Sequence, residues 1–132
     1  MKYNLIYLIF IVLLTFTSCN DESTQSLFSQ VTFRAELPDG RKIVRMEVDK
    51  TLPSTYLRNL NNYTNYEFPL FVNNQGTTHL QKGIYLISFD AIATFEDGTT
   101  ARVRSSQYSN AENALPLLND NENIPLILYL IN

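Results

Sequence analysis

The chain has 132 residues, which leaves room for one domain of ordinary size after a targeting segment. Its 10 basic and 13 acidic residues give a formal charge of −3, which argues against a nucleic-acid partner and against a polybasic contact with anionic lipid. The chain has a single cysteine, which excludes an internal disulfide and a cysteine-based metal site.

The N-terminus has the pattern of a secretory signal peptide. A basic residue is followed by an apolar run over residues 5–16 and by small residues before Cys19. A transmembrane anchor is the alternative, but such a helix needs about 20 apolar residues, and this run is shorter. Acidic residues, Asp21 and Glu22, follow the run in place of Lys or Arg. We therefore expect a signal peptide over residues 1–18.

Cys19 stands where a lipoprotein precursor carries its modified cysteine. The segment Phe16-Thr17-Ser18-Cys19 resembles a lipobox, with Phe16 where Leu is usual, and such looser versions resemble those of the Bacteroidetes. The resemblance implies two or three acyl chains on the new N-terminus, which give stable membrane anchoring. The alternative is an unmodified cysteine of the signal peptide. We expect residues 19–27 to form a polar tether.

The acidic residues at the start of this tether concern the location of the protein in the cell. The pair Asp21-Glu22 resembles the surface-export signal of Bacteroidetes lipoproteins, and the alternative is a solvated linker. The resemblance implies a lipoprotein of the outer membrane that faces the cell exterior.

The first predicted strand, residues 31–37, alternates apolar and polar side chains, as a half-buried strand does. Pro38-Asp39-Gly40 then predicts a turn, and residues 44–48 alternate again. The sequence therefore predicts a hairpin between these two segments. Its inward residues are Val31, Phe33, Ala35, Leu37, Val44, Met46 and Val48.

The middle of the chain is less regular. Residues 54–60 predict a short helical turn after Pro53, and an Asn-rich loop follows. Residues 67–72 predict a short strand, which Pro69 would confine to an edge or a bulge. The next turn signal is Asn73-Asn74-Gln75-Gly76.

The longest predicted strand covers residues 84–95, and Asp97-Gly98 predicts a hairpin turn to residues 99–105. Across this hairpin we expect Asp90 to pair with Arg102 or Arg104. The inward face of the long strand is formed by Tyr85, Ile87, Phe89, Ala91 and Ala93.

The last quarter of the chain predicts a polar loop over residues 107–123 and an apolar strand over residues 124–131. A continuous apolar strand is buried on both faces or covered by another element. This one either closes its own sheet or is offered to a partner, and closure is the simpler alternative.

Six or seven short strands and no long helix predict an all-β fold, a small two-sheet antiparallel sandwich over residues 28–132. The segment Leu80 to Ile87 also resembles the strand-entry signature of transthyretin-like (prealbumin-like) and carboxypeptidase-regulatory-like sandwiches of Bacteroidetes surface proteins. The resemblance implies a transthyretin- or immunoglobulin-like fold. It also implies an adhesive, fimbria-like or accessory role and not the catalysis of a reaction.

Candidate catalytic and metal-binding residues are few. His79 is the only histidine, and one histidine without cysteine makes no zinc site. The chain has the residue types of a Ser-His-Asp site, but no Gly-x-Ser-x-Gly segment or comparable frame accompanies His79, which is better explained as a surface polar residue. The acids Asp90, Glu96 and Asp97 are better explained as turn and cross-strand residues than as a glycosidase pair. Residues 119–123 offer oxygen ligands without the glycine and spacing of a calcium loop. We expect no metal and no cofactor.

Tyrosines near predicted loops give the candidate ligand surface. The residues are Tyr56, Tyr63 and Tyr66, in an Asn- and Tyr-rich segment, and the alternative is a loop that packs its aromatic rings over a sheet edge. Together these patterns favour a non-catalytic, membrane-anchored surface lipoprotein, a binding, adhesion or fimbria-associated module with a protein or glycan partner. The alternatives are an accessory subunit of an outer-membrane nutrient-uptake assembly and a small hydrolase.

Overall fold

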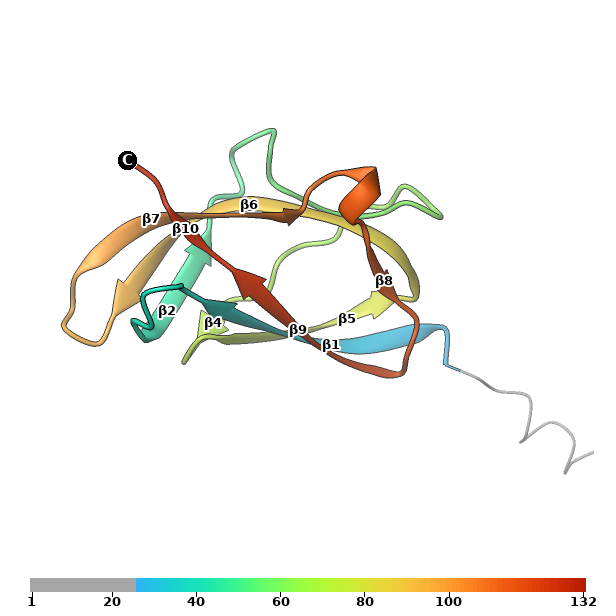
Figure 1. The fold of residues 1–132 in the computed structure, drawn as a ribbon. Coiled ribbons are helices and arrows are strands. Elements are labelled where there is room, and N and C mark those ends of the chain that lie inside the picture. The colour runs from blue at the N-terminus through green and yellow to red at the C-terminus, as the bar shows by residue number, and fades with distance from the viewer. Residues whose placement is uncertain (1–25) are drawn as a thin grey trace, which may run out of the picture.

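The computed structural model describes residues 26–132, and this part of the chain consists mainly of β-strands (Figure 1). The all-β prediction is confirmed, whereas these residues hold ten strands in place of the predicted six or seven. The signal peptide and Cys19 lie outside the described residues. The elements are β1 (Phe28–Glu36), β2 (Ile43–Val48), β3 (Tyr56–Asn59), β4 (Phe71–Val72), β5 (Gln75–Gln81), β6 (Gly83–Phe95), β7 (Thr100–Tyr108), the 3-10 helix η1 (Ala111–Asn113), β8 (Leu115–Leu117), β9 (Asn121–Ile127) and β10 (Tyr129–Leu130).

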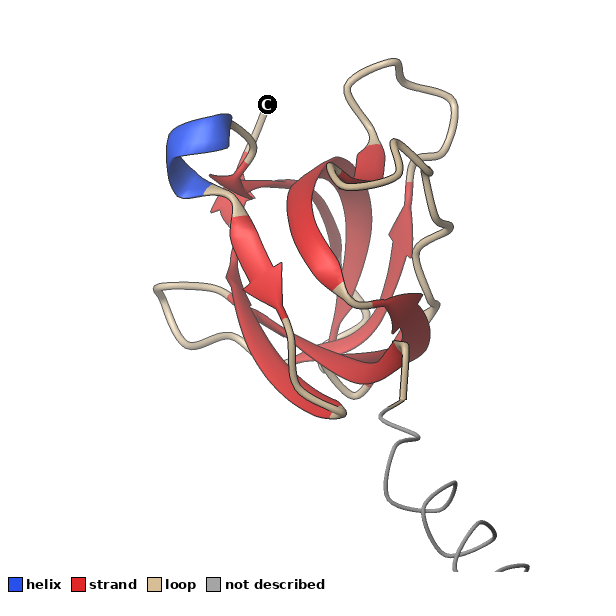
Figure 2. Cartoon of the chain, turned by 90° about the vertical axis from the view of Figure 1, so that its right-hand side faces the viewer, coloured by secondary structure: helices blue, strands red, loops and turns tan. Residues whose placement is uncertain are grey.

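The strands form one curled sheet in the order β10-β7-β6-β2-β4-β5-β1-β9, while β3 and β8 pair with other stretches of the long β6. Only Leu128 separates β9 from β10 in the chain. β9 pairs with β1 at one end of the sheet, and β10 pairs with β7 at the other. The last segment of the chain therefore joins both ends of the sheet, which curls around one core (Figure 2).

The core lies on the inner side of the curl, and the alternation of β1 and β6 predicts its residues correctly. Every second side chain of β1 and of β6 is buried, as a strand with one face on the core requires. The ring of Phe68, from the connection before β4, packs edge-on against Phe89 at a centroid distance of 4.8 Å. The largest fully buried residues are Tyr85, Phe33, Phe71, Phe89, Met46, Leu57, Leu80, Ile87, Leu117, Leu126, Leu128 and Val31.

The hairpin predicted between β1 and β2 is wrong, although its turn exists. Gly40 has a φ of 80°, and its N–H donates to the Leu37 carbonyl oxygen at 3.0 Å. However, β1 pairs with β5 and β9, and β2 pairs with β4 and β6. Alternation specifies which face of a strand is buried but not its neighbour, and both edges of β1 are already occupied. A bulge between Ile43 and Arg45 also buries Ile43 in place of the predicted Val44.

Three predictions for the polar stretches need correction. The helical turn expected over residues 54–60 is the strand β3, because Leu57 and Asn59 alternate inward against β6. The strand expected over residues 67–72 is limited to β4. The segment before β6, for which the sequence predicts no strand, is the strand β5, which pairs along nearly all of β1 although its residues are mostly polar. Hydrogen bonds to neighbouring strands hold such strands in place, so a pattern of apolar and polar side chains does not predict them.

The C-terminal strand closes the sheet of its own chain. Ile124, Leu126 and Leu128 are buried, whereas Tyr129 and Leu130 are half-exposed, so one face of the segment is buried and not both. β9 runs parallel to β1, so the predicted all-antiparallel arrangement is wrong at this pair. The loop predicted over residues 107–123 contains the end of β7, η1, β8 and the start of β9, and β8 pairs with the first residues of β6.

Candidate functional site

The domain has two ends with different features, and β1 runs from one to the other (Figure 1). At the tether end the described chain begins, beside the β5–β6 turn and the β8–β9 connection. At the turn end the β1–β2 connection, the β4–β5 turn and the β6–β7 turn come together. The nine residues of β1 place the two ends roughly 26 Å apart, at about 3.3 Å per residue.

Two asparagines form the β4–β5 turn at the turn end. Asn73 and Asn74 have φ angles of 51° and 60°, the left-handed conformation that asparagine tolerates and that a tight two-residue hairpin turn needs. The N–H of Asn73 donates to the Val44 carbonyl oxygen at 3.0 Å. The Asn74 carbonyl oxygen accepts from the N–H of Ala35 at 2.8 Å. The turn is thus bonded to both β2 and β1, and the predicted turn at this position is confirmed.

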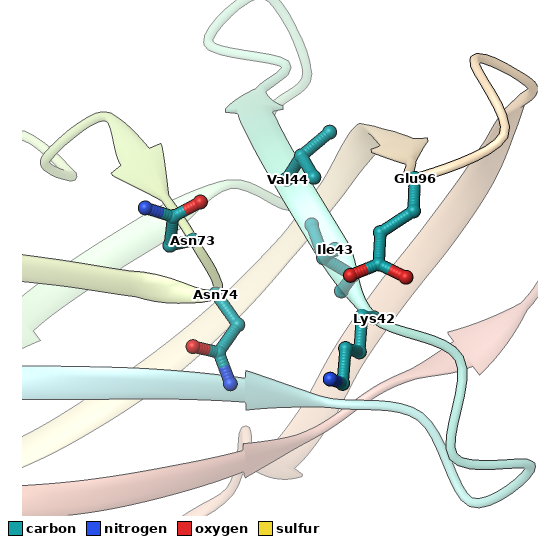
Figure 3. Close-up of a pocket in the computed structure, with 6 residues that line it drawn as sticks. All are labelled: Lys42, Ile43, Val44, Asn73, Asn74 and Glu96. Atoms are coloured by element: carbon teal, nitrogen blue, oxygen red, sulfur yellow. The ribbon is translucent and has the colours of Figure 1, made fainter.

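A hollow of about 220 Å³ lies between this turn, the start of β2 and the end of β6 (Figure 3). We call it the Lys42 hollow, because two further hollows beside it also include Lys42 in their walls. Its volume is below the roughly 300–1,000 Å³ of pockets that enclose a whole small ligand. It fits one unit of a longer ligand or one side chain of a partner. Its lining residues are Lys42, Ile43, Val44, Asn73, Asn74 and Glu96.

The charged residues beside the hollow already interact with other groups of the domain. Asp39 accepts hydrogen bonds from the backbone N–H of Arg41 at 3.0 Å and from its guanidinium at 2.9 Å. These bonds, the backbone bond first, hold the pKa of Asp39 below its usual value. The Arg41 guanidinium also lies 4.5 Å from the centroid of the Phe95 ring. The pKa of Asp97 is lowered too, mainly because the Thr99 hydroxyl donates to its carboxylate.

Lys42 and Glu96 themselves take part in none of the ion pairs found within residues 26–132. The hollow therefore offers an ammonium group, a carboxylate and two side-chain amides that remain available to a ligand. This set of donors and acceptors suits hydroxyl, amide and carboxylate groups. The lining contains no histidine, serine or cysteine, so it presents no nucleophile with an adjacent base.

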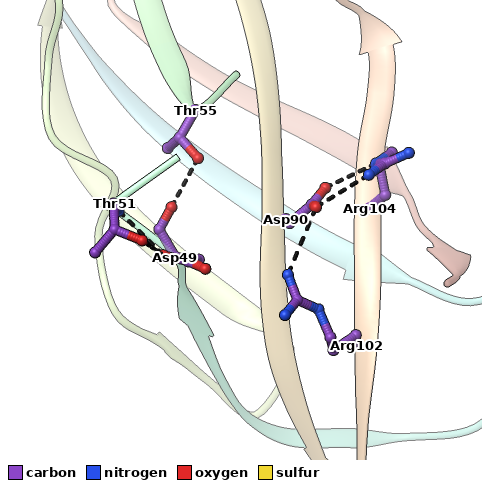
Figure 4. A network of polar contacts seen from close by, with 6 residues as sticks. All are labelled: Asp49, Thr51, Thr55, Asp90, Arg102 and Arg104. Atoms are coloured by element: carbon purple, nitrogen blue, oxygen red, sulfur yellow. Dashed lines mark hydrogen bonds and ion pairs between the residues drawn. The ribbon is translucent and has the colours of Figure 1, made fainter. Parts of the chain in front are cut away.

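A second polar cluster lies on the outer face of β6 and β7 (Figure 4). Asp90 is only 5% exposed and accepts two hydrogen bonds from Arg104, at 2.8 and 3.1 Å. Arg102 lies 3.8 Å from the same carboxylate. The hydrogen bonds from Arg104 are the main cause that holds the pKa of Asp90 below its usual value. The predicted pairing across the hairpin is confirmed, and it joins the two strands.

The three tyrosines predicted as a ligand surface have separate environments. Tyr66 is half-buried against the core, with its ring centroid 6.1 Å from that of Tyr85. Tyr56 lies on β3, and its hydroxyl donates to the Ser109 carbonyl oxygen at 2.9 Å. Tyr63 is 77% exposed in the loop after β3. The structure does not stack these rings on one another, so a ligand surface made of the three stays a prediction.

The other sequence candidates lie on the surface, apart from one another. His79 is exposed on β5, opposite Gln30 of β1. In the stretch considered for calcium, the Asn119 side chain donates to the Glu122 carboxylate at 2.8 Å. Within residues 26–132, no three acidic, histidine or cysteine side chains come together as metal ligands. Nor does any helix in that range have the length and hydropathy that crossing a membrane requires.

Comparison with known proteins gives no match: no protein family, no curated protein and no solved structure aligns with this chain.

Sequence reasoning missed the Lys42 hollow. Its residues come from three turns that lie far apart in the sequence, and none of them belongs to a known motif. The Asn73-Asn74 pair is the available signal, because asparagines that adopt a left-handed backbone mark a tight turn, and binding residues are commonly placed on such loops.

Proposed function

We propose that this chain is a lipid-anchored lipoprotein of the outer membrane, without catalytic activity of its own, that displays the Lys42 hollow to a partner outside the cell. The observation that carries the proposal is the placement of the two ends. The tether that leads back to Cys19 joins the domain at one end, and the hollow lies at the opposite end. An anchored domain with this geometry presents its hollow away from the membrane.

The chemistry of the hollow supports a binding role. Lys42, Glu96 and the amides of Asn73 and Asn74 supply donors and acceptors in a small space on turns held by a rigid sheet. Binding residues are commonly placed on loops of a stable scaffold. The small volume favours one sugar unit of a surface glycan or one polar side chain of a protein partner. We propose such an extended ligand over a free small molecule.

We propose that the curled sheet acts as the two layers of a transthyretin-like sandwich. Support comes from β6 and β7, which lie across the core from β1 and β5 in Figure 1, and from Phe89 of β6 and Phe33 of β1, which belong to one buried core.

Display can be tested with single thiols. If Cys19 is blocked by lipid, a thiol introduced by Glu96→Cys is the only one that a maleimide can label. On intact cells of a Gram-negative host that matures lipoproteins, we expect a membrane-impermeant maleimide to label this variant and to leave the parent chain unlabelled. Cys19→Ser should abolish incorporation of labelled fatty acid and release the protein from the membrane fraction. Fatty acid retained by Cys19→Ser, or labelling of Glu96→Cys only after lysis, would contradict the proposal.

Binding can be tested on arrays of oligosaccharides and of extracellular-matrix peptides. We expect the lipoprotein to retain a subset of these probes, and Lys42→Ala with Glu96→Gln to reduce that retention severalfold. The matched control is Lys50→Ala, because Lys50 is an exposed lysine outside the hollow, paired loosely with Glu67 at 3.9 Å. Equal loss in both variants would indicate general charge attraction and not a site at the hollow.

A further inference from the structure

Three apolar side chains are exposed together at the tether end. Leu27 is 71% exposed, Phe28 is 50% exposed and Leu118 is 59% exposed. We call these three residues the tether-end patch. Single exposed apolar residues are ordinary on a soluble surface, but a group of them marks a contact with a protein or a membrane.

Backbone pairing brings the patch together around Lys82. The N–H of Lys82 donates to the Leu27 carbonyl oxygen at 2.8 Å. On the other side, Leu117 pairs with Gly83, which sets Leu118 next to Lys82. Two segments that are far apart in the sequence thus place their leucines on either side of one lysine, at the end of the domain where the described chain begins (Figure 1).

The charge within the patch is neutralised. The Lys82 ammonium group bonds to the Asp120 carboxylate, and the Lys82 side chain is only 22% exposed. Burial of the patch against an apolar surface therefore does not require an unpaired cation to leave water, which would be costly. This feature favours an apolar occupant over an anionic one.

The length of the tether identifies that occupant. Leu27 lies eight positions after Cys19, and a fully extended chain spans at most about 3.6 Å per position, so the patch lies within roughly 29 Å of the lipidated residue. A short tether also raises the effective concentration of the patch at the surface that holds the anchor. Leucine and phenylalanine are residues that insert at the boundary between headgroups and acyl chains.

We propose that the tether-end patch docks on the bilayer that carries the lipid anchor, so that the domain stands upright on the membrane. This inference rests on the proposed lipidation of Cys19. It goes beyond that function, because a lipid anchor alone leaves the domain free to rotate on its tether. Docking adds a second contact and fixes the turn end on the side away from the membrane.

The test uses the full lipidated protein, reconstituted into phosphatidylcholine vesicles that contain doxyl-labelled lipid. An environment-sensitive fluorophore is attached to Asn119→Cys, next to the patch, or to Glu96→Cys, at the turn end. We expect the doxyl lipid to quench the probe at position 119 severalfold more strongly than the probe at position 96. Equal quenching at the two positions would overturn the docking proposal.

Patch variants make the test specific. In the Asn119→Cys background, Leu27→Ser with Leu118→Ser should abolish the excess quenching while the protein still sediments with the vesicles. The matched control is Leu70→Ser with Leu130→Ser, since each of these leucines is 49% exposed elsewhere on the domain. Excess quenching that persists in the patch variant, or is lost equally in the control, would overturn the docking proposal.

Failure of the anchor has a different signature. If the parent protein does not sediment with vesicles and Cys19 reacts with the fluorophore, the proposed function fails, and the docking proposal fails with it. If the protein sediments and Cys19 is blocked but the probe at position 119 is not quenched, only the docking proposal fails.

Discussion

The β6–β7 hairpin and the surroundings of β1 are held together in different ways. In the hairpin, paired residues such as Ala93 and Ala101 are close in sequence, and the Asp97-Gly98 turn directs one strand onto the other. β1 instead pairs with strands far along the chain, and Gln30 lies opposite Asn121, about 90 positions away. The first arrangement is encoded locally, whereas the second exists only when the whole sheet has formed.

Among the changes that test this comparison, removal of β10 and most of β9 should cause the largest loss of stability. A chain that ends at Glu122 loses Ile124, Leu126 and Leu128, all buried, and each such side chain contributes about 2–5 kcal/mol. Their sum is comparable to the whole stability of a typical domain, about 5–15 kcal/mol. We expect the shortened chain to lose its cooperative thermal transition, measured by circular dichroism.

The control for this truncation is a chain that lacks only Ile131 and Asn132, which should melt almost as the parent does. A shortened chain that stays folded and monomeric, and binds the peptide of residues 124–132 only between chains, would show that the last strand is donated to a partner. The fimbria-associated alternative would then become the better proposal.

Substitutions of two buried phenylalanines should distinguish the two regions by their effects on the folding and unfolding rates. Phe89 lies on β6 and Phe33 on β1, and each is almost completely buried, so Phe89→Ala and Phe33→Ala should each lower the free energy of unfolding by about 3–5 kcal/mol. Because local contacts form first, we expect Phe89→Ala mainly to slow folding and Phe33→Ala mainly to speed unfolding, as measured by stopped-flow fluorescence. The opposite partition would mean that β1 belongs to the folding nucleus.

The Asp90 cluster predicts a pH dependence for the hairpin. Since the folded state lowers the pKa of Asp90, the carboxylate stabilises the protein above its unfolded pKa of about 3.9, and this stabilisation is lost as the pH falls through the lower folded pKa. Asp90→Asn should cost about 1 kcal/mol at neutral pH, because both arginines are half-exposed and solvent screens the pair.

Urea unfolding measured from pH 7 to pH 2 checks this prediction. The difference between parent and Asp90→Asn should shrink as the pH falls below about 4. Glu96→Gln is the control, because Glu96 takes part in none of the ion pairs within the described residues. A difference that stays constant with pH would mean that the aspartate acts through its shape and not its charge.

The two turn glycines, Gly98 and Gly40, should have effects on stability no larger than that of Asp90→Asn. Each has a φ near 80°, and an added Cβ would meet no atom within 4 Å, so alanine is strained by the backbone alone, by about 1 kcal/mol. The costs at equilibrium should be similar. Only Gly98→Ala should slow folding, because the strands beside Gly40 do not pair with each other. Equal folding rates for the two variants would contradict the comparison between local and distant pairing.

The sequence predicts those parts of the fold that depend on neighbours in the chain. The inward faces of β1 and β6, the turn at Asp97-Gly98 and the pairing of Asp90 with arginine all follow from short patterns. The sequence does not predict β5 and β3 as strands. Pairing with neighbouring strands orders these two segments, and their own side chains show no clear strand pattern. The partner of β1 was predicted wrongly for the same reason, since alternation carries no information on which strand lies alongside.

The candidate site was even less accessible to sequence reasoning. Lys42 and Glu96 are ordinary surface residues in the sequence, and they become part of one hollow only because β2 and β6 pair at Ile43 and Phe95. The tether-end patch likewise needs β8 beside β6 before Leu118 can lie near Leu27.

β9 and β10 follow all the other strands of the sheet in chain order, which has a consequence for the timing of synthesis. Both ends of the sheet bind to this segment, so a nascent chain cannot close its sheet until β9 and β10 have been made. Pairing across such long separations is also slow after the chain is complete. A polypeptide of this design therefore stays open until its last two strands are available, however early its hairpin forms.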